Sequence, residues 1–138
     1  MIRRTGRRQA QCGAAMIEFA ITGIALMLLM LGCIELDRLV LVRTSMANAA
    51  EEGVRYASVQ AAQDITGVQT TVKNYATGVN TSAMTVTVTY SAGDNGQTAG
   101  NPGSKVKVQA TYAYDPLVAT ILPSGLTVTA VAQGIIVY

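Results

Sequence analysis

The feature that most constrains this chain is an apolar run, Ala14–Ile34, that one carboxylate interrupts near its start. Apart from Glu18 and Thr22, the run holds only apolar or small residues. As a helix it would measure ~31 Å, close to the ~30 Å hydrocarbon core of a bilayer. It is longer than the ~7–15 apolar residues of a secretory signal, and no cleavage site of the signal-peptidase type closes it. The sequence therefore predicts a transmembrane helix over residues 14–34.

The charges before this run predict its orientation. A basic leader, residues 1–13, carries four arginines: Arg3, Arg4, Arg7 and Arg8. Because basic residues favour the cytoplasmic side of a membrane span, we expect the leader inside the cell. We therefore expect a single-pass protein of the cytoplasmic (inner) membrane, with its C-terminal part extracytoplasmic.

Glu18 is unusual because a carboxylate in a membrane span is costly. The cost is about 2.5–3.5 kcal/mol at the helix centre and smaller near an interface. A chain that carries such a residue usually has a use for it. A plain signal anchor would explain the span, but it leaves the spacing between Gly13 and Glu18 unexplained.

The helical pattern continues beyond the membrane segment. Over residues 35–60 apolar residues recur at intervals near three and four, and no proline interrupts them. We expect one long helix from about Ala14 to about Val59, amphipathic in its outer half, with Glu51 and Arg55 as an i,i+4 pair. Four small residues within it form a packing seam: Ala49, Ala50, Gly53 and Ala57. The seam allows close backbone approach, either by the chain's own sheet or by a neighbouring subunit.

Residues 61–138 predict a small α+β domain. Thr66-Gly67 is expected to be a break, with Val68–Val79 as a short second helix. Period-two alternation rich in β-branched residues predicts three strands: Met84–Tyr90, Lys105–Tyr114 and Leu126–Tyr138, the last with a bulge or kink at Gly134. Ser91–Ser104, which holds four glycines, is expected to be a flexible hairpin loop. The fold class is then α+β, a long helix covering an antiparallel sheet of about three strands.

The composition argues against several functional classes. The chain has no histidine, the commonest general base and metal ligand, and no cluster of acids or cysteines has usable spacing. We therefore expect no catalytic residue, no metal or cofactor site and no enzymatic activity. Beyond the leader the chain is mildly acidic and lacks a basic patch, so we expect no nucleic-acid partner. No phosphate-cradling glycine motif is present, and we expect no small-molecule substrate.

Two sequence blocks resemble the TadE-like family of pilus assembly proteins. The first is the basic leader followed by residues 13–20 (GAAMIEFA), and the second is residues 48–57 (NAAEEGVRYA), which is similar to the NAA-x-x-G-x-R-Y-A block of that family. The resemblance is strongest from Gly13 to about Val59. Family members often carry a proline near the position of Gly23 or Ile24, and this chain has none there, so we expect a straighter helix.

The resemblance implies a pilin-like fold and a minor pilin-like (pseudopilin) subunit needed for biogenesis of Tad/Flp-type adhesive pili. A prepilin peptidase would cut between Gly13 and Ala14, removing residues 1–13. Glu18, then the fifth residue, would pair with the new amine of a neighbouring subunit and set the axial register. Phe19 would belong to the same register site or simply pack against lipid or helix.

The implied partners are a prepilin peptidase, other pilin or pilin-like subunits, the inner-membrane secretion platform and membrane lipid. The subunit would either enter a surface pilus or remain in the membrane as an assembly factor. The competing interpretation is a single-pass, signal-anchored extracytoplasmic binding module unrelated to pili. In that case Ser91–Ser104 would be the expected contact element. An enzyme is a distant third alternative.

Overall fold

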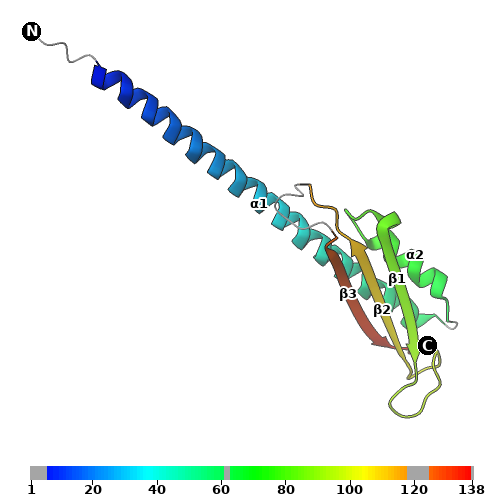
Figure 1. Ribbon diagram of the computed structural model, residues 1–138. Coiled ribbons are helices and arrows are strands. Elements are labelled where there is room, and N and C mark those ends of the chain that lie inside the picture. Colours follow the sequence, from blue (N-terminus) through cyan, green and yellow to red (C-terminus); the bar gives the residue numbers. More distant parts are fainter. Residues whose placement is uncertain (1–5, 61–62, 118–124, 138) are drawn as a thin grey trace, which may run out of the picture. The chain divides into compact units, whose positions relative to one another are not determined.

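The computed structural model describes residues 6–60, 63–117 and 125–137, and only the backbone of residues 6–12. Its elements are a long helix, a short helix, a 3-10 turn and three strands (Figure 1): α1 (Gly6–Val59), α2 (Ile65–Tyr75), η1 (Thr81–Ala83), β1 (Met84–Ser91), β2 (Lys105–Ala113) and β3 (Thr127–Ile135). The predicted α+β class is therefore confirmed. By contacts the chain divides into two compact units, Met1–Leu36 and Asp37–Tyr138, and we describe each by itself.

The first helix begins earlier than the sequence suggested. α1 starts at Gly6 rather than near Ala14, and it ends at Val59 as predicted. The predicted start was wrong because the end of the leader (GRRQAQC) contains no proline and is rich in arginine, glutamine and alanine. These residues have good helix propensity, so the helix extends back through them.

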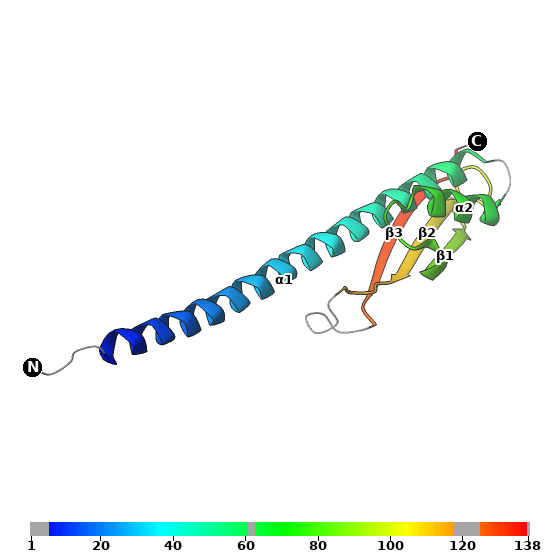
Figure 2. The same ribbon diagram turned by 90° about the horizontal axis from the view of Figure 1, so that it is seen from above.

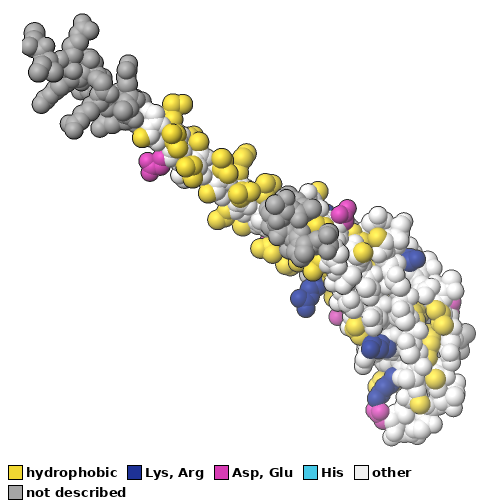
Figure 3. Space-filling view, in the orientation of Figure 1, with side chains coloured by type: hydrophobic (Ala, Val, Ile, Leu, Met, Phe, Trp, Pro, Cys, Tyr) yellow, Lys and Arg dark blue, Asp and Glu magenta, His cyan; other side chains and the backbone are white. Residues whose placement is uncertain are grey.

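The first unit contains the candidate membrane span. Its apolar window has a mean hydropathy of 2.3, and none of that window is buried. The large side chains are open to the surroundings, as in Phe19 at 81% and Met16 at 75% exposed, and they form the yellow stretch along α1 in Figure 3. Length and composition thus make this helix able to cross a bilayer.

The second unit is built on an antiparallel sheet of order β1-β2-β3. Side chains alternate between the two faces of the sheet along each strand. One face packs into the core, and the other carries mainly threonine, lysine and glutamine. The β2–β3 register is unbroken, with Val106 opposite Gly134, so the predicted bulge at Gly134 is wrong. A Cβ at Gly134 would lie 2.4 Å from Val54 Cγ1, so the glycine instead permits close approach of α1.

Both helices cover the apolar face of this sheet, and Figures 1 and 2 show the C-terminal half of α1 alongside the strands. Val54 of α1 meets Gly134, and further along both elements the Val137 N–H donates to Ser58 O at 3.0 Å. These two contacts show that α1 and β3 run in the same direction. The core between the layers is largely aliphatic, with Met46, Val68, Val72, Val106, Val108 and Ile136 almost fully buried.

The second helix corrects another prediction. α2 begins at Ile65, so Thr66-Gly67 lies inside the helix and is not a break. Asp64 caps the helix, its Oδ1 accepting from the Gly67 N–H at 2.8 Å. A side-chain acceptor at this position satisfies a backbone donor that the helix itself leaves unpaired. The helix also ends earlier than predicted, at Tyr75 instead of Val79.

The segment between β1 and β2 is a hairpin connection, as predicted, and hydrogen bonds organise it. The Gly100 N–H donates to Ser104 Oγ at 3.0 Å. Gln63 Nε2 donates to Ala99 O at 2.8 Å, which ties the loop to the connection between α1 and α2. Ser104 is fully buried, so this end of the loop forms part of the folded unit.

Candidate functional site

The candidate register site lies on one face of α1 in the first unit. Residues spaced three and four apart line a shallow hollow of about 380 Å³: Ala14, Ile17, Glu18, Ile21 and Thr22. Glu18 therefore shares a face with Ala14, ~6 Å further along the helix axis. The Thr22 hydroxyl donates to the backbone oxygen of Glu18 at 2.8 Å and leaves the carboxylate exposed. Among the described residues no cation forms an ion pair with that carboxylate.

The two residues flanking this site make no packing contacts that would explain their identity. A Cβ placed on Gly13 would meet nothing within 4 Å, so the chain's own packing does not require glycine there. Phe19 is 81% exposed. Packing within the described part of the chain therefore accounts for neither residue.

The structure leaves the predicted topology residues untested. Arg3 and Arg4 lie outside the described residues. Arg7 and Arg8 lie within α1, where only the backbone is described.

The small-residue seam of α1 is buried in the core of the second unit. Ala49 and Ala50 are fully buried and Ala57 is 1% exposed. A Cβ at Gly53 would lie 2.4 Å from Val72 Cγ2 of α2 and 3.5 Å from Val108 Cγ1 of β2. Of the two alternatives that the sequence left open, the structure thus shows the seam packing on the chain's own helix and sheet.

A polar network beside the seam was not recognised in the sequence. The Tyr56 hydroxyl donates to Asp64 Oδ2 at 3.1 Å and accepts from Gln60 Nε2 at 2.9 Å. Asp64 also caps α2, so the network links the end of α1 to the start of α2. A Cβ at Gly67 would lie 2.0 Å from Asp64 Oδ2, which explains the glycine. The available signal was the Asp64-to-Gly67 spacing, typical of a capped helix start.

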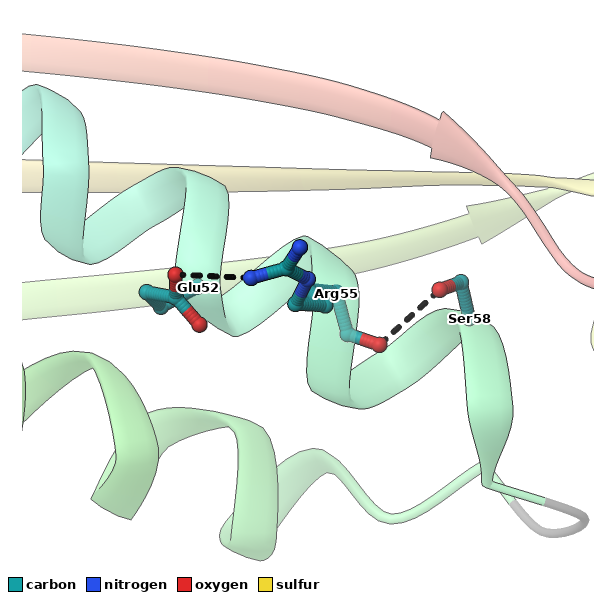
Figure 4. Close-up of polar contacts among 3 residues, drawn as sticks. All are labelled: Glu52, Arg55 and Ser58. Carbon is teal, nitrogen blue, oxygen red and sulfur yellow. Dashed lines mark hydrogen bonds and ion pairs between the residues drawn. The ribbon is translucent and has the colours of Figure 1, made fainter.

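The charged pair on the outer face of α1 differs from the predicted one. Arg55 Nη1 lies 3.3 Å from Glu52 Oε1, an i,i+3 pair, so the predicted Glu51–Arg55 pairing is wrong (Figure 4). Residues three and four apart are both helix neighbours, so sequence spacing alone could not choose between them. The backbone oxygen of Arg55 accepts from the Ser58 hydroxyl at 2.9 Å.

The second unit has an open groove of about 590 Å³ between α1 and the end of α2. Its lining mixes exposed apolar and polar residues: Asp37, Val40, Leu41, Thr44, Ser45, Asn48, Tyr75 and Thr77. The Ser45 hydroxyl donates to Thr77 O at 2.7 Å. Across the described residues, no group of three histidine, cysteine or acidic side chains is placed to hold a metal ion.

Comparison with known proteins identifies one segment, which carries the candidate register site and the Glu52–Arg55 ion pair. The family model for TadE-like proteins matches residues 13–55, from the glycine before the register site to the arginine of the outer ion pair. Neither the curated proteins nor the solved structures gave a match. Residues 13–55 are therefore a TadE-like segment, as the sequence predicted, and they associate the chain with Tad pilus-related proteins.

Proposed function

We propose that this protein is a minor pilin-like subunit required for biogenesis of Tad/Flp-type pili, with a structural and not a catalytic role. The observation that carries the proposal is the placement of Glu18. Its carboxylate sits on an exposed apolar helix, on the same face as Ala14, with no cationic partner among the described residues. Such a group needs a partner from another molecule.

Cleavage after Gly13 would supply that partner. Removal of residues 1–13 leaves Ala14 with a charged α-amine. In a bundle of identical or related helices, the Glu18 carboxylate of one subunit accepts from the amine of its neighbour. An unpaired charge in a low-dielectric environment is strongly unfavourable, so the pair favours one axial offset between the subunits.

The helical state of the cleavage site gives Gly13 a physical purpose. The Gly13–Ala14 bond lies inside α1, and a peptidase needs an extended backbone at the bond it cuts. Glycine lowers helix stability by roughly 1 kcal/mol relative to alanine, so it eases local unwinding at this bond. Because a Cβ at position 13 would meet nothing, Gly13→Ala changes this property without a clash.

We propose the following arrangement in the cell. Residues 14–34 span the cytoplasmic membrane, the arginine leader faces the cytoplasm, and the second unit is extracytoplasmic. The partners are a prepilin peptidase, pilin or pilin-like subunits, the inner-membrane secretion platform and lipid. The exposed apolar side chains of the first unit support the contacts with lipid and with other helices.

Mass spectrometry after co-expression with a prepilin peptidase tests the processing step. We expect loss of residues 1–13 with an active peptidase and retention with an inactive one. Gly13→Ala should slow the cut about fivefold, since about 1 kcal/mol of extra helix stability opposes unwinding. Gly23→Ala is the matched control, because a Cβ there also meets nothing, and it should be cut normally. An intact leader in peptidase-positive cells would refute the proposal.

A separate experiment tests the role of Glu18. Glu18→Gln removes the charge but keeps the size, and we expect normal membrane insertion and processing with loss of pilus assembly. Glu18→Asp keeps the charge on a shorter stem and should assemble partially. Normal piliation in the Glu18→Gln strain would contradict the register role.

A further inference from the structure

The second unit carries an exposed sheet edge that its proposed role does not use. β2 lies between the other two strands, so β1 and β3 each have one edge. An edge strand presents unpaired N–H and C=O groups that can bind another strand. The two edges differ in how many of their backbone groups are hydrogen-bonded within the chain.

Side chains and turns occupy the β1 edge. Gln69 of α2 donates through Nε2 to Val86 O at 2.9 Å. The Met84 N–H is bonded to Thr81 O of the preceding 3-10 turn. The Met84 N–H and the Val86 C=O of this edge are therefore already bonded within the chain.

The hydrogen-bond pattern shows which groups of β3 point outward. The Tyr114 N–H donates to Leu126 O, and the Ile136 N–H donates to Ser104 O, so the even-numbered residues at both ends of β3 pair toward β2. In an antiparallel ladder the bonded and non-bonded positions alternate. The backbone groups that face away from β2 therefore belong to the odd-numbered residues: Thr127, Thr129, Val131, Gln133 and Ile135. We call this set the open β3 edge.

The open β3 edge lacks the devices that usually block strand addition. Its sequence, TVTAVAQGI, contains no charge and no proline. The register with β2 is regular over all nine residues, so no bulge twists the edge away. Within the part of the chain that the structure describes, the only backbone bond on this side is that of the Val137 N–H to Ser58 O, just beyond the strand.

A groove beside the open β3 edge indicates which strand would fit. It measures about 230 Å³ and is lined by Leu39 and Arg43 of α1 and by residues 126–129. A strand added to β3 would direct alternate side chains toward this groove. Leu39 favours an apolar side chain there, and the exposed Arg43 favours a carboxylate.

A second copy of this chain does not meet these requirements. None of its three strands carries an aspartate or glutamate. In addition, α1 and β3 run in the same direction, so antiparallel pairing of two β3 strands would put the two Asp37 ends at opposite ends of the dimer. Two chains anchored in one membrane by the segment before Asp37 could not pair in this way.

We infer that the open β3 edge is a strand-addition site for an extended segment of a different protein, with a carboxylate that meets Arg43. Main-chain hydrogen bonds would supply affinity, and the groove would supply specificity. The site itself is argued from residues 37–138, and only the exclusion of an antiparallel second copy also uses the proposed membrane anchor. The inference stands or fails independently of cleavage at Gly13 and of the register role of Glu18.

The test uses the full-length chain in detergent micelles and capped nine-residue peptides of alternating threonine and valine. One valine is replaced by aspartate near either the N- or the C-terminus, so that both strand directions are sampled. We expect one of these peptides to slow hydrogen exchange at the amides of Thr129, Val131 and Gln133. The corresponding lysine peptide should bind at least tenfold more weakly, which is about 1.4 kcal/mol.

Two pairs of variants sharpen the test. Val131→Pro removes an outward N–H that has no partner among the described residues, so it should abolish peptide binding while the fold is retained. Val131→Thr keeps that N–H and should bind normally. Arg43→Glu should reverse the preference and favour the lysine peptide, whereas Arg43→Lys should keep it.

Three results would overturn the inference. The first is absence of amide protection with either aspartate peptide at millimolar concentration. The second is equal binding of the aspartate and lysine peptides. The third is a dimer of the chain that Val131→Pro dissociates, because it would make a second copy the occupant.

Discussion

The close approach of α2 to α1 at Gly53 makes a quantitative prediction for Gly53→Ala. The added Cβ would lie 2.4 Å from Val72 Cγ2, whereas carbon atoms pack at ~3.5–4.0 Å. Val72 is fully buried, and a β-branched side chain has few alternative rotamers. Val108 Cγ1 lies 3.5 Å from the same point, so the new methyl group has no free space on the side of the sheet either.

Two opposing effects determine the outcome. Replacing glycine by alanine in an open helix position stabilises by roughly 0.8–1.0 kcal/mol. Overpacking a core costs about 1–3 kcal/mol. We expect the clash to outweigh the propensity gain and to leave a net loss of about 1 kcal/mol. For a folded unit of about 100 residues, that loss lowers the melting temperature by about 4–8 °C.

Thermal unfolding of the full chain in detergent, followed by circular dichroism, measures this change. Gly32→Ala is the control, because a Cβ there meets nothing within 4 Å, and it should leave the melting of the second unit unchanged. The double variant Gly53→Ala/Val72→Ala removes the methyl group that clashes. Its loss should be smaller than the sum of the two single losses by about 1 kcal/mol. A higher melting temperature for Gly53→Ala would refute the close-packing argument.

Three further predictions use the same unfolding assay. Tyr56→Phe removes the hydroxyl that bonds Asp64 and should cost about 1 kcal/mol, and an unchanged free energy of unfolding would show that the network contributes nothing. Arg55→Ala should cost less than about 0.5 kcal/mol, because the Arg55 side chain is 79% exposed, and a loss above 1 kcal/mol would contradict a solvent-screened pair. Gly134→Ala should cost about 1–3 kcal/mol through its clash with Val54 Cγ1, and Gly134→Ala combined with Val54→Ala should recover part of that loss.

The strands could be predicted because their signal is local. Alternation of valine and threonine in β1, and of valine and lysine in β2, separates a core face from a solvent face. The same pattern constrains the pairing, since a shift of one residue would exchange the two faces. The strand boundaries consequently agree with the sequence to within a few residues.

Two of the wrong predictions concern glycines, which can be required either by the local backbone or by the packing of another side chain. Gly67 and Gly134 were interpreted as a break and a bulge, which are the usual local meanings of glycine. In the structure Gly134 makes room for Val54, which is distant in sequence, and Gly67 makes room for the capping Asp64 side chain and for the Tyr56 hydroxyl. The contacts with Val54 and Tyr56 are tertiary, so no local pattern contains them, whereas the Asp64 cap was a local signal that the interpretation missed.

The candidate site was predicted unevenly for a similar reason. The spacing of Ala14 and Glu18 is a helix property, and it is visible in the sequence once the helix is recognised. The environment of the small-residue seam is not visible in the sequence, because a row of small residues serves an internal contact and an intermolecular one equally well. Only the distances from Gly53 to Val72 and Val108 show which contact the second unit makes.

The parallel course of α1 and β3 has a mechanical consequence. A pull applied to the second unit at its first residue, Asp37, would run along α1. Because α1 lies lengthwise on the sheet, from Leu39 beside the start of β3 to Ser58 beside its end, the load acts as shear on the whole helix–sheet contact at once. At Gly134 the close approach of Val54 lets side chains interlock across this contact and resist sliding, and at Gly53 the same holds between α1 and α2. The second unit is thus arranged to transmit axial tension without being peeled apart.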